Sequence, residues 1–220
     1  GVTLDVVQKP AADIKTDFIA QAPTGEGPDL IVGAHDWTGD LVKNGVIAPV
    51  ELGDKVAGFA DTAITAFTNG GQLYGVPYAI ENIALVRNNK LATTTPATFD
   101  ELVAQGKASG AEFPILIQQG ANGDAYHLYP LQTSFGAPVF TTDASGEYTA
   151  ELGMGGPEGV AFANYLKKLA GEGALNASLG ADQAKQAFLE GKSPYIITGP
   201  WATGDFVSAG IDIAVLPVPS

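Results

Sequence analysis

Short apolar runs of strand length alternate with segments of helical hydrophobic spacing along this 220-residue chain. We predict strands at residues 2–7, 30–32, 72–87, 113–117, 194–198 and 211–216. Amphipathic or capped helical segments lie between them, and glycine or proline separates most neighbouring elements. Because strands that alternate with helices pair through crossover connections, this order predicts an α/β fold with largely parallel sheets.

The stretch at residues 25–40 joins a predicted strand to a predicted helix. Leu30, Ile31 and Val32 form an apolar run suited to a strand that is covered on both faces, and Thr38 can cap the helix that follows. Open α/β sheets bind ligands at the carboxyl ends of such strands. The residues that this placement puts at the binding edge are Ala34, His35, Asp36 and Trp37.

The charge balance argues against nucleic acid and anionic membranes as partners. The chain has 24 acidic against 11 basic residues, a formal net charge of −13, and Arg87 is its single arginine. It therefore has no basic patch that could neutralise phosphates. It contains no cysteine, which excludes disulfides and thiolate metal sites. Its apolar runs are much shorter than the roughly 18 residues of a membrane-spanning helix.

Four loops at predicted strand ends present aromatic rings, and three of them also carry a carboxylate. They are Asp36 with Trp37, residues 78–81 ending in Glu81, Asp124 with Tyr126, and the turn at 199–201 that contains Trp201. A carboxylate accepts hydrogen bonds from hydroxyl groups, and an aromatic ring covers an apolar face. The recurrence of this pair therefore favours a sugar ligand.

Each of these residues also has a plainer interpretation. The aromatic residues could simply pack, Asp36 could serve only as a helix cap, and Glu81 could lie on a solvated strand face. A glycosidase remains open as well, because Glu81 with Asp36 or Asp124 could act as acid and base at roughly 5–10 Å separation. His35 and His127 lack the short spacing of a metal motif, so we expect no metal site. We expect no other cofactor either.

Six segments, in order along nearly the whole chain, resemble the extracellular sugar-binding proteins of ATP-binding-cassette importers, most closely the maltose/maltodextrin-binding proteins. They include Gly27-Pro-Asp-Leu-Ile-Val-Gly-Ala-His-Asp36, Gly75-Val-Pro-Tyr-Ala-Ile-Glu81 and Thr198-Gly-Pro-Trp201, together with residues 85–90, 126–131 and 188–192. Their joint order and spacing make the match specific. The chain departs from the family at Trp37, where some members have arginine, and at Gly33, where some have tryptophan.

The resemblance implies a periplasmic-binding-protein-like α/β fold, with two α/β lobes and the ligand in the cleft between them. On this basis we expect residues 1–79 to form the first lobe, 80–82 a hinge crossing, 83–217 the second lobe, and 218–220 the start of a return hinge. The family has a further strand and helix before Val2 and a long C-terminal part, neither of which is in this sequence. We therefore expect a fragment whose first lobe is incomplete.

Carried over by position, the resemblance assigns contacts with a maltodextrin-type sugar to all four loops. Asp36 and Glu81 would accept hydrogen bonds from glucosyl hydroxyls. The other implied contacts are the backbone of Ala34, the stacking rings of Tyr126 and Trp201, and the acidic position Asp124 beside the tyrosine. Trp37, next to Asp36, is a further candidate for a ligand contact.

The same resemblance implies a non-catalytic carrier that delivers sugar to the membrane permease subunits of an importer. We expect an extracellular or periplasmic monomer, and lipid anchoring through an N-terminal segment outside this sequence is an open alternative. The exact sugar and its chain length also stay open. Besides the glycosidase, a binder of another solute, such as a peptide or a polyamine, is a remote alternative that only the negative charge suggests.

Overall fold

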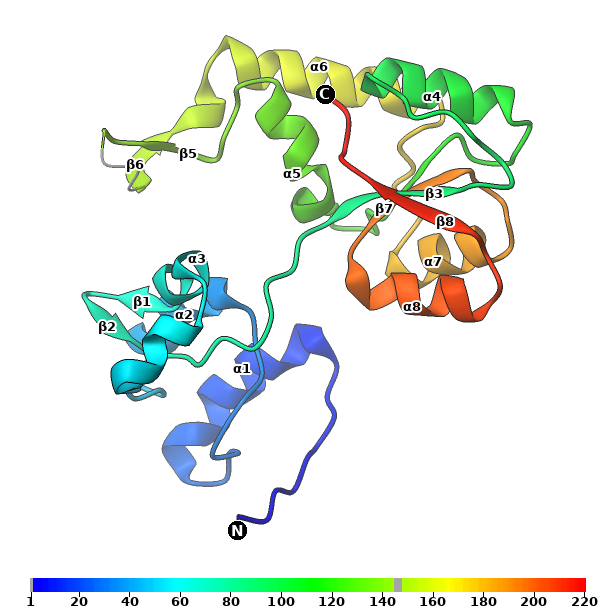
Figure 1. Ribbon diagram of the computed structural model, residues 1–220. Helices are drawn as coiled ribbons and strands as arrows, with labels where there is room; N and C mark the ends of the chain where they lie inside the picture. The colour runs from blue at the N-terminus through cyan, green and yellow to red at the C-terminus, as the bar shows by residue number, and fades with distance from the viewer. Residues whose placement is uncertain (1, 145–147) are drawn as a thin grey trace. The chain divides into compact units, whose positions relative to one another are not determined.

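The computed structural model describes residues 2–144 and 148–220 of the chain (Figure 1). The chain forms two compact units, Gly1–Ile80 and Glu81–Ser220. The division between them falls within the predicted crossing at residues 80–82. The hinge role of that crossing, and of residues 218–220, stays a prediction.

The regular secondary structure of the first unit is mainly helical. Helix α1 spans Ala11–Gln21 and buries Phe18, as the apolar spacing within this segment predicts. Helices α2 and α3 span Thr38–Lys43 and Asp61–Ala66, and 3-10 turns cover Ala22–Thr24, His35–Trp37 and Gly53–Gly58. A hairpin of β1 (Thr68–Asn69) and β2 (Gln72–Leu73) turns through Gly70 and Gly71, both of which have positive φ.

Two predicted strands of the first unit are absent from the part of the chain that the structure describes. Residues 2–7 and 30–32 have no regular secondary structure and pair with no described strand. Their apolar side chains are largely exposed, with Val6 85%, Leu30 78% and Val32 67% accessible. Both strand predictions are therefore wrong, because an apolar run does not by itself supply the neighbouring strand that a ladder requires.

The second unit is built on a four-stranded sheet in the order β4-β7-β3-β8. Its strands are β3 (Ala84–Asn88), β4 (Leu116–Ile117), β7 (Tyr195–Thr198) and β8 (Ile213–Leu216). Strand β4 is parallel to β7, whereas β3 is antiparallel to both β7 and β8. The prediction of a largely parallel sheet is thus wrong. Strand β3 follows extended chain rather than a crossover helix, and its direction is opposite to that of the other three strands.

Helices cover both faces of this sheet (Figure 1). One face packs against α4 (Phe99–Ala108), α5 (Ala125–Ser134) and α6 (Pro157–Gly171), and the other against α7 (Ala181–Leu189) and α8 (Pro200–Ser208). Neighbouring strand residues point to opposite faces. Leu85 and Ile197 accordingly belong to the first core, and Val86 and Ile196 to the second.

Local sequence signals set the starts of α4 and α5. The spacing Thr98-x-x-Glu101 predicts a capping box, and the backbone N–H of Glu101 does donate to Oγ1 of Thr98 at 3.1 Å. Asp124 caps α5 in the same way, since its side chain accepts from the backbone N–H of His127. A hairpin of β5 (Phe140–Thr142) and β6 (Tyr148–Leu152), followed by a 3-10 turn at Gly153–Gly155, lies between α5 and α6 along the chain.

Candidate functional site

Three loops of the second unit meet at one edge of its sheet. The carboxyl ends of β4 and β7 lead into residues 118–124 and Gly199, and the amino end of β3 follows residues 81–83. The register places Ala84 opposite Thr198 and Ile117 beside Ile197, so these three strand ends are neighbours. Loops at the carboxyl ends of parallel strands are where open α/β sheets bind ligands. The predicted site residues of this unit therefore share one edge.

Two half-exposed aromatic rings contact a buried histidine at this edge. Tyr126 is 55% and Trp201 50% accessible, whereas His127 is 4% accessible. The ring centroid of His127 lies 5.4 Å from that of Tyr126 and 6.1 Å from that of Trp201, and both contacts are edge-on. The structure thus links Tyr126 and Trp201, two predicted site residues, through the ring of His127. From the sequence, His127 was considered only as a possible metal ligand.

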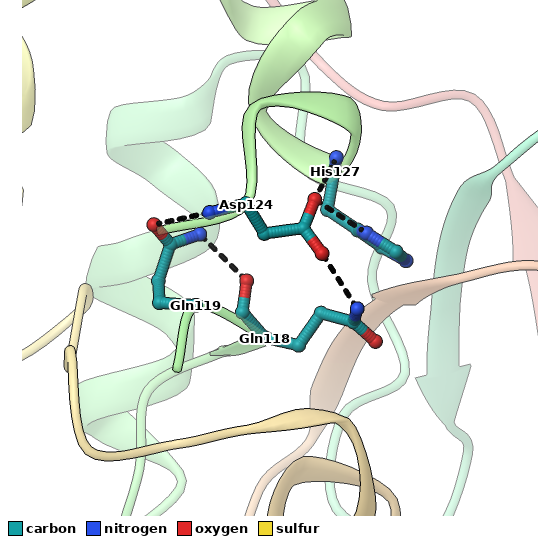
Figure 2. A network of polar contacts seen from close by, with 4 residues as sticks. All are labelled: Gln118, Gln119, Asp124 and His127. Carbon is teal, nitrogen blue, oxygen red and sulfur yellow. Dashed lines mark hydrogen bonds and ion pairs between the residues drawn. The ribbon is translucent and has the colours of Figure 1, made fainter. Parts of the chain in front are cut away.

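Asp124 is held by hydrogen bonds from its own chain (Figure 2). Its Oδ1 accepts from the backbone N–H of His127 at 2.9 Å and lies 3.0 Å from Nδ1 of the same residue. Its Oδ2 accepts from Nε2 of Gln118 at 2.6 Å, and Gln119 donates to the carbonyl of Gln118. With its side chain only 18% accessible, Asp124 has partners for both carboxylate oxygens within the chain.

These hydrogen bonds keep the Asp124 carboxylate ionised. Partial burial raises the pKa of Asp124, but hydrogen bonds from the backbone and ring of His127 and from Gln118 outweigh it and hold the pKa below its usual 3.8. The position of the carboxylate at the N-terminus of α5 also suits a negative charge. Asp124 is therefore a charged acceptor at neutral pH.

We expect Asp124→Asn to remove part of the acid sensitivity of the second unit. Because the folded-state pKa lies below the unfolded value, the ionised group stabilises the fold above the unfolded value, and this contribution is lost as the pH falls through the folded pKa. Asparagine can still cap α5. In urea unfolding, the difference in free energy of unfolding between the unaltered chain and the variant should shrink below about pH 4. A difference that stays constant in acid would contradict this assignment.

A hollow of about 620 Å³ adjoins Tyr126 in the second unit. It lies among the amino end of β3, helix α5 and the end of β8, and its walls include Asn82, Tyr129 and Leu216. Sequence reasoning missed Tyr129, although a spacing of three places it on the same helix face as Tyr126. Glu81, directly before Asn82, is exposed to solvent, as its plainer interpretation expects, but it lies before β3 and not on a strand.

The first unit holds the other predicted site residues. Ala34 and Asp36 are exposed at the 3-10 turn His35–Trp37. The Trp37 ring lies against Gly33, where a Cβ would fall 2.5 Å from the indole. Among the described residues, neither Asp36 nor Thr38 makes a capping hydrogen bond at this turn or at α2. The predicted Thr38 cap and the interpretation of Asp36 as only a cap are therefore both wrong.

The chemistry at the edge of the second unit is that of aromatic faces, amides and carboxylates. Within residues 2–144 and 148–220, no group of three or more His, Asp or Glu side chains is arranged to hold a metal ion. No helix in this part of the chain is long and apolar enough to cross a membrane. Glu81, Tyr126 and Trp201 are all exposed there.

Comparison with known proteins identifies the family. A family model described as bacterial extracellular solute-binding protein matches residues 1–220. The chain belongs to this family. The structure of the Thermus thermophilus maltotriose binding protein bound with maltotriose matches 99% of this chain with a TM-score of 0.88 and 34% sequence identity. This match confirms the predicted solute-binding α/β fold.

Curated relatives of this solute-binding protein are longer than the chain. The maltotriose-binding protein of Pyrococcus abyssi is 29% identical over 98% of the chain. The maltooligosaccharide ABC transporter solute-binding lipoprotein of Streptococcus pneumoniae R6 is 26% identical over 90% of it. The chain spans about half the length of these relatives, 47% and 48%, and 59% of the Thermus protein.

Proposed function

We propose that this solute-binding protein binds a maltodextrin-type oligosaccharide, without catalysis, for an ATP-binding-cassette sugar importer. The observation that carries the proposal is the pair of half-exposed rings, Tyr126 and Trp201, that contact one buried imidazole at the sheet edge. Membership of the family and the maltotriose- and maltooligosaccharide-binding names of its relatives support this ligand class.

Aromatic faces and carboxylates suit the two kinds of surface that a glucosyl ring presents. Tyr126 and Trp201 offer apolar faces to the C–H side of a sugar ring. Asp36 in the first unit and Glu81 in the second are exposed carboxylates that can accept hydrogen bonds from sugar hydroxyls. We assign direct sugar contacts to these four residues.

The remaining candidates have lesser or indirect roles in the proposal. In the first unit, the exposed backbone of Ala34 and the ring of Trp37 add contacts beside Asp36. In the second unit, Oδ2 of Asp124 accepts one hydrogen bond from Gln118 and retains a lone pair for a hydroxyl. Because both oxygens of Asp124 already have partners, we expect its direct contribution to be smaller than that of Glu81.

Asp36→Asn and Glu81→Gln test the proposed carboxylate contacts. Each change keeps the size of the side chain and removes the charge that strengthens a hydrogen bond from a hydroxyl, so each should weaken maltotriose binding about tenfold or more. Calorimetric titration with maltotriose, glucose and a galactooligosaccharide measures both affinity and the choice of sugar. Glu151→Gln, an exposed carboxylate on β6, is the matched control and should bind as the unaltered chain does.

Product analysis separates a carrier from an enzyme. We expect maltotriose to be recovered intact after prolonged incubation with the chain. Glucose or maltose released by the unaltered chain, and not by Glu81→Gln, would establish a glycosidase and contradict the proposal. Saturable binding of the galactooligosaccharide alone would contradict the proposed ligand class instead.

We propose further that the whole protein is an extracellular monomer that delivers sugar to permease subunits and is lipid-anchored through an N-terminal segment. The family description supports the location, and the lipoprotein relative of an ABC transporter supports the anchor and the partner. Metabolic labelling of the full-length protein with a fatty-acid analogue tests the anchor. Light scattering of the soluble chain tests the monomer, and transport assays with the cognate permease test the partner.

A further inference from the structure

His127 is the buried member of a cluster of three rings at the sheet edge. Its ring contacts those of Tyr126, beside it in the first turn of α5, and Trp201, in the first turn of α8. These two neighbours are the exposed rings to which we assign sugar stacking. His127 is therefore the group through which two stacking rings from different helices are linked.

Asp124 fixes the orientation of the His127 ring (Figure 2). Because the Asp124 carboxylate is ionised at neutral pH, it can only accept hydrogen bonds. Nδ1 of His127, 3.0 Å from Oδ1, must therefore donate, which makes the neutral ring the Nδ1–H tautomer. Gln118 in turn holds the other carboxylate oxygen at 2.6 Å.

Packing alone does not explain why this buried position holds a histidine, because the second ring nitrogen, Nε2, is left unpaired in the described part of the chain. Nε2 of His127 is buried and has no hydrogen-bond partner among residues 2–144 and 148–220. An unpaired buried polar atom destabilises a fold, and a phenyl ring would fill the same space without one. What the imidazole adds is the hydrogen bond to Asp124, which a phenyl ring cannot make.

The backbone constrains Trp201 as well. The indole lies against Gly199, where a Cβ would fall 2.1 Å from Cζ3 of the ring. Gly199 directly follows β7 and precedes the first residue of α8, so its position is set by the sheet. The indole is thus confined by the Gly199 backbone and by the His127 ring.

We propose that His127 is a positioning residue: Asp124 fixes its ring, and its ring sets the orientation of Tyr126 and Trp201 toward the sugar. Asp124 then contributes to binding mainly by acting through His127. The inference rests on the proposed function for the identity of the ligand. The orientation of the rings can be measured without any ligand.

Nitrogen NMR of the two imidazoles in the unliganded chain tests the orientation of His127. The chain has two histidines, and the exposed His35 serves as an internal reference. At a pH where both rings are neutral, we expect the Nδ1–H tautomer for His127 and a solvent-like tautomer mixture for His35. The same mixture for both rings would overturn the proposal.

His127→Asn tests the role of the ring. Asparagine keeps a side-chain N–H that can donate to Asp124 but removes the ring contacts, so the Kd for maltotriose should rise about threefold to tenfold. In a Trp37→Phe background, where Trp201 is the only tryptophan, acrylamide should quench fluorescence more strongly when His127 is replaced. Leu131→Val, a core change on the same helix, is the control. It should lower Tm without changing the Kd or the quenching.

His127→Phe keeps the proposal testable if the asparagine variant fails to fold. Phenylalanine retains a ring but not the hydrogen bond to Asp124, so Tm should equal or exceed that of the unaltered chain while the Kd for maltotriose rises about threefold. Unchanged affinity and unchanged Trp201 quenching in the folded variants would overturn the proposal. If the unaltered chain does not bind maltotriose, the proposed function fails, whereas the NMR and quenching results still decide the role of His127.

Discussion

Trp201→Ala is expected to weaken maltotriose binding about thirtyfold and to leave the fold intact. The indole is 50% accessible, and α8 is anchored in the core by Ala202 and Phe206 instead. Removing the indole deletes an apolar face for a sugar ring, and tryptophans at the centre of binding sites typically contribute ~2 kcal/mol or more. Calorimetric titration measures the affinity, and circular dichroism with thermal unfolding measures the fold.

Tyr148→Ala is the matched control for the tryptophan change. Tyr148 is an aromatic residue of the same unit, 77% accessible, on β6 and not on a loop at the sheet edge. Its removal should leave the Kd for maltotriose unchanged. If Trp201→Ala bound maltotriose as tightly as the Tyr148 variant does, the indole would be a packing residue, which is the plainer interpretation of its sequence position.

Elements that depend on a few neighbouring residues could be predicted from the sequence. The caps of α4 and α5 require only Thr98 and Asp124 next to helical segments, and α1 requires only the apolar spacing that buries Phe18. The candidate residues on α5 and α8 followed from the same local logic. Each lies in the first turn of a helix that follows a strand, at the edge where an α/β sheet presents its ligand-binding loops.

Features that depend on distant parts of the chain could not be predicted in this way. The direction of β3 is decided by its pairing with β7 and β8, which lie more than a hundred positions further along the chain. Residues 30–32 have the composition of a buried strand, yet they have no described partner and are partly or largely exposed. An apolar composition allows a segment to form a strand, but pairing with another strand decides whether it does so.

The role of His127 was missed because its decisive contacts are not local. The spacing Asp124-x-x-His127 at a helix start could have signalled a cap whose third residue also reaches the carboxylate. The contact with Trp201 has no such signal, since it follows from the packing of α5 and α8 around β7 and β3 at the sheet edge. The sequence therefore predicted the exposed rings of Tyr126 and Trp201 as site residues, but not the buried ring of His127 that contacts both of them.

Gly106→Ala is expected to destabilise the second unit by roughly 2 kcal/mol. Gly106 lies on the buried side of α4, and a Cβ there would fall 2.0 Å from the carbonyl oxygen of Pro114 and 2.6 Å from its carbonyl carbon. These are backbone atoms just before β4, so the clash can be relieved only by moving the helix or the strand away from the core. Urea unfolding followed by circular dichroism measures the change.

Gly204→Ala is the matched control for this prediction, because its effect on stability should have the opposite sign. Gly204 lies within α8 of the same unit, and a Cβ there would meet nothing within 4 Å. Alanine at an open helical position removes the entropy penalty of glycine, so this variant should be more stable by up to about 1 kcal/mol.

Opposite shifts from the same chemical change would show that the approach of α4 to the Pro114 backbone requires glycine. That approach also fixes β4, and with it Gln118, which holds Asp124 from the end of the strand. A stabilising effect of Gly106→Ala would mean that α4 does not pack this closely on the strand.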